Sequence, residues 1–219
     1  MAIIAHASID ERNKIKGGSA GDQTGKEVCK RSWYNKPWGC VIRFADPVMR
    51  EKIAVCMEMA ADNNNIGYDQ NQRNTLLSKA RKYNYNVSKV KEPCETDCSA
   101  LVCVACMYAG VPESALTLNG NCATTRTLKA ALKSTGEVDI YTTPLYTQKS
   151  DRLIRGDILL KEGAHVAVVV QSDAKDINTL AKEVIAGKWG EGAARRIALE
   201  SAGYDYDKVR QKVNELLGK

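Results

Sequence analysis

The sequence predicts an α+β domain followed by a small bundle of three helices. Extended apolar runs stand at both ends of the first domain, over Ile3–Ile9 and His165–Gln171, and helical patterns lie between them. The run Cys98–Ala109 is almost entirely apolar or small, as in a buried helix. Beyond Gln171 the sequence becomes polar and then helical up to Leu217. Strands and helices followed by an all-helical tail favour this fold class.

We accordingly expect a domain of ordinary size over residues 1–172, a polar linker over 173–177 and a helical module over 178–219. The 219 residues suffice for one ordinary domain and a small extra one. The hydrophobic fraction of 44% suits a folded core. No stretch approaches the roughly 18 apolar residues of a membrane helix, so we expect no membrane insertion.

The first half of the large domain predicts two strands and two helices. The Ile3–Ile9 strand precedes a polar, glycine-rich turn region, and Cys40–Phe44 is a second extended run. Pro47 suits the first turn of a helix, whose apolar side ends before three consecutive asparagines. A further helix is predicted over Gln72–Lys82.

The second half predicts a buried helix and a hairpin. Pro93 prevents a helix from running into the apolar segment from upstream, so we expect that helix to begin at or near Asp97. Another helix is predicted around Thr125–Lys133. The runs Asp157–Leu160 and His165–Gln171 are separated by four residues that include a glycine, which indicates a β-hairpin.

The carboxyl-terminal module predicts three short helices. They cover Ile177–Ala186, Ala193–Ala202 and the segment up to Leu217, with glycine-bearing turns between them. A bundle this small has a marginal core, so we expect Trp189 and Tyr204 to supply much of its packing.

The net charge of +6, with a pI near 8.8, favours polyanionic partners. Acidic polymers of a bacterial wall, anionic lipid and nucleic acid all fit that description. The basic residues are scattered among acids and no helix-turn-helix, zinc-finger or aromatic RNA-binding signature occurs, so we expect no nucleic-acid partner. The first residues lack the pattern of a secretory signal, which predicts a chain kept in the cytosol until it is released.

Cys98 is the candidate nucleophile. A thiol at the amino terminus of a helix faces free backbone N–H groups and the positive end of the helix dipole, which favour the reactive thiolate. The thiolate needs a general base, and the chain has two histidines, His6 and His165. His165 opens a predicted strand that can bring its imidazole beside Cys98 if the helix packs on the sheet.

Simpler interpretations of these residues stay open. A cysteine on an apolar helix can be a small buried hydrophobe, and a histidine at a strand edge can be structural. The spacings Cys94-x-x-x-Cys98 and Cys103-x-x-Cys106 could hold a structural zinc ion, although cysteines inside a helix suit such a site poorly. We expect no metal, no cofactor and eight reduced thiols.

Three segments resemble the NlpC/P60 class of papain-like peptidoglycan peptidases: Asp97–Val102, Gly156–Leu159 and His165–Val170. The stretch from His6 to Gln171 is more closely similar to the catalytic domain of phage endolysins related to that class and to the CHAP amidases. Segments that carry this likeness include Ala20–Val28, Trp33–Trp38 and Ile66–Arg73. The resemblance implies a papain-like fold with Cys98 as nucleophile and His165 as base, and with Tyr68, Asp97 and Ser99 along the substrate cleft.

One departure from the NlpC/P60 pattern concerns the third catalytic residue, which orients the base. The family carries it on a strand after the histidine, whereas this chain leaves the domain soon after Gln171. The amino-terminal run around His6 resembles that missing strand. We therefore expect a permuted arrangement in which His6 hydrogen-bonds the ring of His165, with Gln171 and Asp173 as the other candidates.

The carboxyl-terminal module is similar to the CW_7 cell-wall-binding repeat. The likeness is carried by Leu180–Gly190, Arg195-Arg196, Ala202–Asp207 and Val213–Leu217. It implies binding to the glycan-with-short-peptide unit of bacterial peptidoglycan. Trp189 and Tyr204 could stack on sugars, Arg195 could pair with a stem-peptide carboxylate, and Asp205 completes the predicted wall-binding set. A purely structural role for the two aromatic residues fits equally well.

These resemblances together imply a peptidoglycan hydrolase that cleaves an amide bond of the stem peptide through an acyl-enzyme. The bond between D-isoglutamate or D-isoglutamine and the diamino acid is favoured, which predicts an endopeptidase. An N-acetylmuramoyl-L-alanine amidase is the alternative. A wall-binding protein without catalysis is an alternative of another class. The enzyme would act on the wall after release from the host cytoplasm.

Overall fold

The computed structural model describes residues 2–202 and 204–218. The chain divides into two compact units, Met1–Ser172 and Asp173–Lys219. The first unit combines a sheet with several helices, so the predicted α+β class is confirmed.

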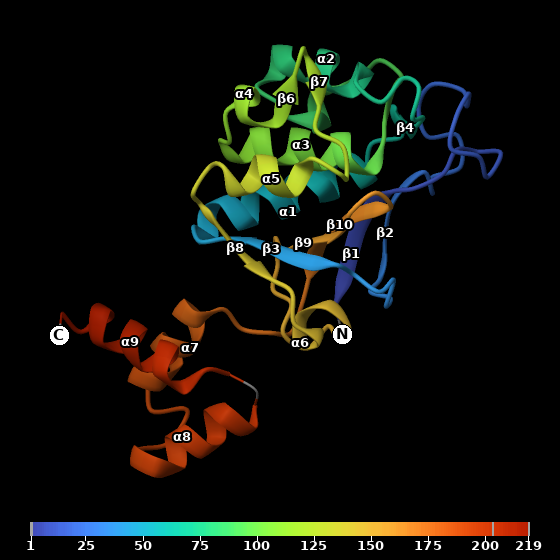
Figure 1. The fold of residues 1–219 in the computed structure, drawn as a ribbon. Coiled ribbons are helices and arrows are strands. Elements are labelled where there is room, and N and C mark those ends of the chain that lie inside the picture. Colours follow the sequence, from blue (N-terminus) through green and yellow to red (C-terminus); the bar gives the residue numbers. More distant parts are fainter. Residues whose placement is uncertain (1, 203, 219) are drawn as a thin grey trace. The chain divides into compact units, whose positions relative to one another are not determined.

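A six-stranded antiparallel sheet forms the centre of the first unit (Figure 1). Its order is β2-β1-β10-β9-β3-β8. The strands are β1 (Ile3–Ala7), β2 (Val28–Ser32), β3 (Cys40–Phe44), β8 (Val138–Tyr141), β9 (Ile158–Lys161) and β10 (His165–Gln171). The amino-terminal strand is therefore an interior strand, hydrogen-bonded on both sides.

The predicted hairpin is present as β9 and β10. Its register pairs His165 with Lys161 and Val168 with Ile158. On the other side of β10, Ala5 of β1 pairs with Val168. The first strand ends at Ala7, two residues earlier than expected. The first and last strands of the domain are thus direct neighbours in the sheet.

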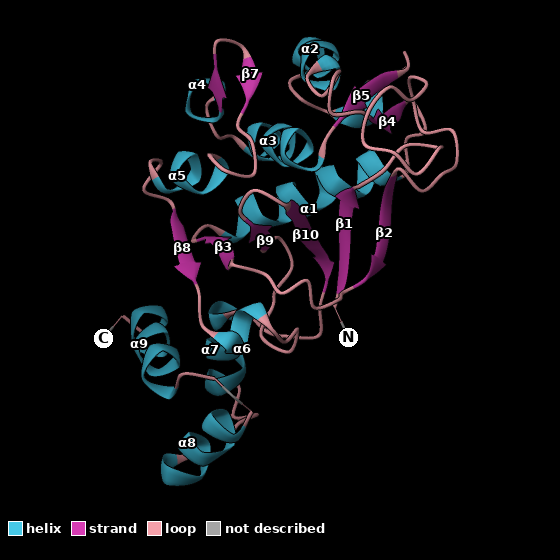
Figure 2. Cartoon of the chain, turned by 45° about the vertical axis from the view of Figure 1, so that its right-hand side comes forward, coloured by secondary structure: helices cyan, strands magenta, loops and turns pink. Residues whose placement is uncertain are grey.

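Two long helices cover one face of this sheet (Figure 2). The helix α1 (Pro47–Ala61) begins where the Asp46 carboxylate accepts a hydrogen bond from the Val48 N–H at 2.8 Å. The helix α3 (Cys98–Ala109) begins where Asp97 accepts from the Ala100 N–H at 2.7 Å. Gly110 ends α3 with a φ of 118°, a conformation that a glycine adopts without strain. The predicted start of this helix is confirmed.

The opposite face of the sheet carries a second, smaller apolar cluster. Strand alternation separates the two clusters: Ala5 and Ala7 pack with the helices, whereas Ile4 packs on the other face with Trp38 and Val169. By the same alternation the His6 side chain lies on the Trp38 side. The first unit is therefore layered, with the sheet between the helices and an aromatic-rich surface layer.

Short elements complete the unit. They are α2 (Thr75–Ala80), the 3₁₀ turns η1 (Arg81–Tyr83) and η2 (Val87–Lys89), α4 (Glu113–Leu116), α5 (Leu128–Lys133) and α6 (Pro144–Thr147). Two small sheets pair β4 (Ile66–Tyr68) with β5 (Cys94–Thr96) in parallel, and β6 (Thr117–Leu118) with β7 (Asn121–Cys122). The helices predicted at Gln72–Lys82 and Thr125–Lys133 are shorter than expected, each beginning three residues late.

The second unit is a bundle of α7 (Ile177–Ile185), α8 (Gly192–Ser201) and α9 (Tyr206–Leu216), as predicted. Its core is small and consists of Leu180, Val184, Leu199 and Val209. Partly buried side chains pack around that core, and they include Trp189 and Tyr204. Across residues 2–202 and 204–218, none of the helices has the length and apolar character needed to traverse a bilayer.

Candidate active site

Two histidines from neighbouring strands form a buried pair. The Nδ1 atom of His6 on β1 lies 2.8 Å from the Nε2 atom of His165 on β10. The rings meet edge to face, with centroids 5.0 Å apart and planes at 78°. His6 is 2% exposed and His165 is 6% exposed, so both rings are largely withdrawn from water. The hydrogen bond expected between these histidines is present, because β1 lies beside β10.

Aromatic side chains hold the histidine pair on the face opposite the helices. The Trp38 ring stacks on His165 with centroids 6.1 Å apart, and the Tyr34 ring lies 6.5 Å from His6. The Trp38 indole N–H donates to the Tyr34 carbonyl at 3.1 Å, which fixes the two aromatic residues relative to each other. These aromatic rings pack against both imidazole rings. The sequence had indicated the Trp33–Trp38 segment without assigning this role.

Burial makes both histidines weak bases. Desolvation, followed by the charges of Arg31 and Lys36, lowers the pKa of His6 to about 4. Desolvation also lowers the pKa of His165 to about 3, with further contributions from His6, Lys36 and Arg31. Both rings are therefore neutral at pH 7, and one donates its N–H to the other.

The hydrogen bond between the rings has two possible directions. If the Nε2–H of His165 donates to Nδ1 of His6, the Nδ1 atom of His165 keeps a free lone pair and can act as a base. The remaining proton of His6 then sits on its Nε2 atom, which is buried and has no hydrogen-bond partner. Neutral His165 is a base only in this tautomer.

Cys98 is the first residue of α3, directly after the capping Asp97. Its sulfur lies close to the backbone N–H groups of Val166 and Ser99, which favour the thiolate. Burial nevertheless raises the pKa of the Cys98 thiol to about 12, and the charge of Asp97 adds to that effect. The expected thiolate is therefore wrong for the resting state, because desolvation outweighs the helix amino terminus.

The Cys98 thiol and the His165 ring lie on different faces of the sheet. Cys98 packs with the helix-side cluster, whereas His165 contacts Trp38 on the other face. The Cys98 sulfur lies close to the backbone N–H of Val166, the residue after His165 in β10. Among the described contacts, none is a hydrogen bond between the sulfur and the His165 ring. Direct proton transfer between them would require the two side chains to come closer, and contacts of this kind commonly tighten only when substrate binds.

Asp97 and Ser99 are both bound by an arginine that the sequence analysis did not assign. The Arg73 guanidinium donates to Asp97 through Nε at 2.5 Å and to the Ser99 hydroxyl at 2.9 Å. It also donates to the Cys122 carbonyl at 2.8 Å and to the Ala123 carbonyl at 2.9 Å. Arg73 thereby joins the start of α3 to β7. A planar group with five N–H donors suits this junction.

Tyr68 lies beside the same turn. Its strand β4 pairs Tyr68 with Thr96, the residue before Asp97. Its hydroxyl accepts a hydrogen bond from the Gln70 amide at 3.0 Å. Burial raises the pKa of Tyr68, so the phenol remains protonated. The three residues predicted along the cleft are therefore grouped around the candidate nucleophile.

Of the two other candidates for the third catalytic residue, Gln171 lies far from His165 along the strand. Gln171 is exposed at the far end of β10, six residues from His165, or roughly 20 Å along an extended strand. Asp173 follows that strand and belongs to the second unit. Gln171 therefore cannot orient the His165 ring.

The cysteines form no disulfide, and all eight thiols are free. Within the described part of the chain, no group of three or more histidine, cysteine or acidic side chains could hold a metal ion. Cys103 and Cys106 point from α3 into fully buried surroundings, where burial raises the pKa of the Cys106 thiol. The zinc interpretation finds no support in this geometry.

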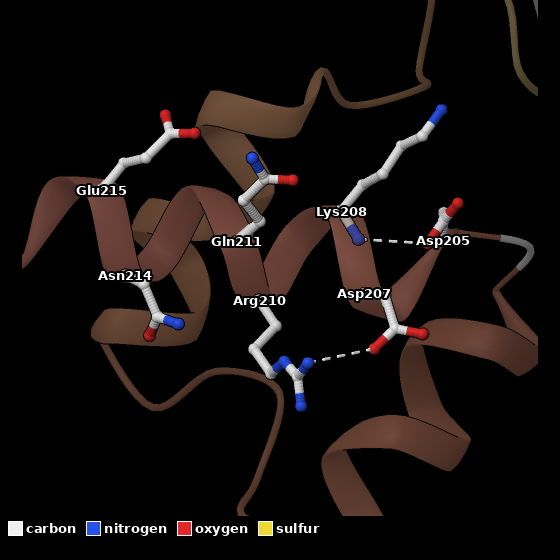
Figure 3. A pocket seen from close by; sticks show the side chains of 7 residues that line it. All are labelled: Asp205, Asp207, Lys208, Arg210, Gln211, Asn214 and Glu215. Atoms are coloured by element: carbon white, nitrogen blue, oxygen red, sulfur yellow. Dashed lines mark hydrogen bonds and ion pairs between the residues drawn. The ribbon is translucent and has the colours of Figure 1, made fainter. Parts of the chain in front are cut away.

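In the second unit, the four predicted wall-binding residues have different surroundings. The Trp189 and Tyr204 rings pack edge to face at 5.9 Å, and the Trp189 N–H donates to Glu183 at 3.0 Å. Arg195 donates to the Gly190 carbonyl at 2.8 Å. Asp205 caps α9 and lies at one end of a polar pocket along that helix (Figure 3). The pocket is lined by Asp205, Asp207, Lys208, Arg210, Gln211, Asn214 and Glu215.

Comparisons with known proteins agree with the division of the chain into two parts. A family model described as an endolysin-like domain matches residues 4–176, and one described as a CW_7 repeat matches residues 178–217. A protein named lysozyme from Streptococcus phage Cp-7 is 55% identical over 59 residues. That stretch is 27% of this chain and 17% of the phage protein, so the chain spans less than a fifth of that relative. No solved structure matches the chain.

Proposed function

Because the chain belongs to the family of endolysin-like domains, we propose that it hydrolyses bacterial peptidoglycan as a cysteine peptidase, with Cys98 as nucleophile and His165 as general base. The observation that carries the proposal is the buried His6–His165 hydrogen bond of 2.8 Å, located at the strand start against which the Cys98 sulfur packs. A nucleophile, a base and a third group that orients the base are the parts such a mechanism needs. We assign the unit to the papain-like NlpC/P60 type on the same grounds.

The reaction proceeds by acyl transfer. The Nδ1 atom of His165 takes the thiol proton while the sulfur attacks the amide carbonyl carbon. The imidazolium then protonates the leaving amine, and a thioester remains on Cys98. Water, deprotonated by His165, attacks the thioester, releases the carboxylate product and leaves the thiol free. Backbone N–H groups at the start of α3, such as that of Ser99, stabilise the oxyanion.

The favoured substrate bond joins D-isoglutamate or D-isoglutamine to the diamino acid of the stem peptide. The CW_7 repeat would hold the enzyme on the wall, with Trp189, Arg195, Tyr204 and Asp205 as the proposed contacts. Because the two aromatic rings pack in the bundle core, they would present only their outer edges to sugars. The enzyme would reach the wall after its release from the host cytoplasm.

Digestion of purified sacculi followed by mass spectrometry of the fragments tests this function. Cleavage between the second and third stem residues is expected, with a new amino group on the diamino acid. Release of intact stem peptides from muramic acid would instead identify an N-acetylmuramoyl-L-alanine amidase. Binding to sacculi without any fragment would identify a wall-binding protein and contradict hydrolysis.

Replacement of His6 tests its role as the orienting residue. In the variant His6→Ala the His165 ring loses its acceptor at Nε2, so we expect kcat to fall by about 10- to 100-fold with little change in KM. The variant His6→Gln offers a side-chain carbonyl to the same N–H and should recover much of that loss. Steady-state kinetics on a soluble stem peptide measures both. Equal activity of wild type and His6→Ala would remove His6 from the mechanism.

The pH dependence follows from the depressed pKa of His165. Neutral His165 is the active form, so kcat/KM is lost only as the pH falls through the free enzyme's pKa of about 3. We expect kcat/KM to change less than about twofold between about pH 5 and pH 8. An acid limb near pH 6.5, the pKa of an ordinary histidine, would contradict this expectation.

Protein stability must be followed in parallel in this experiment. A histidine whose folded-state pKa lies below its unfolded value destabilises the fold as the pH falls below about 6.5, since only the unfolded chain binds the proton. Circular dichroism at each pH separates lost folding from lost catalysis.

A further inference from the structure

Two cations lie beside the histidine pair without an acidic partner. The guanidinium carbon of Arg31 on β2 is 4.7 Å from the centre of the Tyr34 ring, and Lys36 Nζ is 5.8 Å from the same centre. That ring in turn lies 6.5 Å from the ring of His6. Neither cation forms an ion pair with any residue of 2–202 or 204–218. The two cations of Arg31 and Lys36 therefore lie on the Tyr34 ring, near His165, and no acidic side chain among the described residues neutralises them.

These charges act on the reaction centre. Arg31 and Lys36 both contribute to the lowered pKa values of His6 and His165, after the larger effect of burial. The Tyr34 phenol is also within electrostatic reach of the Cys98 sulfur. The proposed mechanism requires His165 to become a cation, and neighbouring positive charge opposes that step. In the free enzyme these two side chains therefore disfavour the imidazolium.

The neighbouring basic residue on the same strand behaves differently. Lys30 points to the other side of β2 and forms an ion pair with Asp62 at 2.7 Å. The chain thus pairs a surface lysine with an acid at one position and leaves Arg31 and Lys36 unpaired at the site. An anionic group of the substrate could neutralise the charges of Arg31 and Lys36.

We propose that Arg31 and Lys36 form a carboxylate subsite, which binds the free α-carboxylate of D-isoglutamate next to the scissile amide. This inference rests on the proposed function and narrows it from either D-isoglutamate or D-isoglutamine to the acid. A guanidinium and an ammonium group together give a carboxylate charge-assisted hydrogen bonds. The Tyr34 ring packs under both cations, and the hydrogen bond from the Trp38 indole to the Tyr34 carbonyl helps to hold Tyr34 in place.

Binding of the carboxylate has a second effect. The bound anion neutralises the field of Arg31 and Lys36, so the imidazolium of His165 costs less in the complex than in the free enzyme. The correct substrate would therefore raise kcat as well as lower KM. A substrate that carries a carboxamide in place of the carboxylate leaves both cations uncompensated.

Two synthetic stem peptides that differ only at this group test the subsite. One carries D-isoglutamate before the diamino acid, and the other carries D-isoglutamine. For the wild type we expect kcat/KM about tenfold higher on the acid. The variants Arg31→Gln and Lys36→Gln should each reduce that preference to about threefold, and the double variant should abolish it. Lys30→Gln, on the same strand, is the matched control and should keep the wild-type ratio.

Binding without turnover gives a second measurement. Calorimetry with the variant Cys98→Ala should give tighter binding of the acid peptide than of the amide, and addition of both Arg31→Gln and Lys36→Gln should remove the difference. Equal cleavage of both peptides by the wild type, or an unchanged preference in the double variant, would overturn the subsite while the proposed hydrolase stands. Failure of the wild type to cut either peptide would overturn the assigned bond, and the subsite with it.

Discussion

Replacement of Cys98 by alanine is expected to abolish the lysis of sacculi, with kcat reduced by at least about 10³-fold. The sulfur supplies the electrons for the bond to the carbonyl carbon, and alanine has no atom that can form it. Cys98→Ser keeps the size of the side chain but offers a poorer nucleophile, so a similar loss is expected. Release of soluble fragments from sacculi measures the activity, and circular dichroism verifies the fold.

Cys29 provides a matched control for this experiment. It lies opposite His6 in the β1–β2 register and is more exposed than Cys98, whose side chain is buried. The variant Cys29→Ser should keep close to wild-type activity, although it removes a thiol near the same histidine. Continued hydrolysis by Cys98→Ala would contradict the cysteine mechanism.

Long regular patterns in the sequence predicted their elements correctly, and short or exposed ones did not. The apolar run of α3 and the β9–β10 hairpin are examples of correct predictions, because burial on every side demands apolar residues throughout. The edge strand β2 was missed. Its burial decreases from Val28 to an exposed end at Ser32, and an edge strand depends more on backbone hydrogen bonds than on apolar side chains. The three-residue strands β4 and β5 are too short to show any period.

The candidate site could be predicted where a motif or chain order carried the information. His6 was found because its strand was missing from the usual place, and the sheet brings it to His165. Arg73 could not be found in this way. Its partners Asp97 and Cys122 lie 24 and 49 residues away, and no local pattern links them. The position of Cys98 at a helix amino terminus led us to expect a lowered pKa. That expectation was wrong because burial, which the sequence does not reveal, raises the pKa of this thiol.

Replacement of Asp157 by alanine is expected to lower the free energy of unfolding by about 3–5 kcal/mol. The Asp157 side chain is fully buried and accepts two hydrogen bonds from Arg43, each 2.7 Å long, and one from the Ile154 N–H at 2.8 Å. Its removal would leave the Arg43 side chain, which is only 15% exposed, without its counter-charge. Chemical denaturation of the first unit measures the effect.

The surface pair Lys30–Asp62 is the control for this change. Both of its side chains are well exposed, so Asp62→Ala should cost no more than about 1 kcal/mol although it removes the same kind of ion pair. The double replacement Arg43→Met with Asp157→Leu should be less harmful than Asp157→Ala alone, since it leaves no unpaired charge. The backbone of Asp157 also supports the strand that carries His165. The Asp157 carbonyl accepts a hydrogen bond from the Val169 N–H of β10 at 2.9 Å. Asp157→Ala should therefore lower activity through its effect on stability, and activity should recover at lower temperature. A loss of activity that persists in the fully folded protein would instead assign Asp157 to the reaction itself.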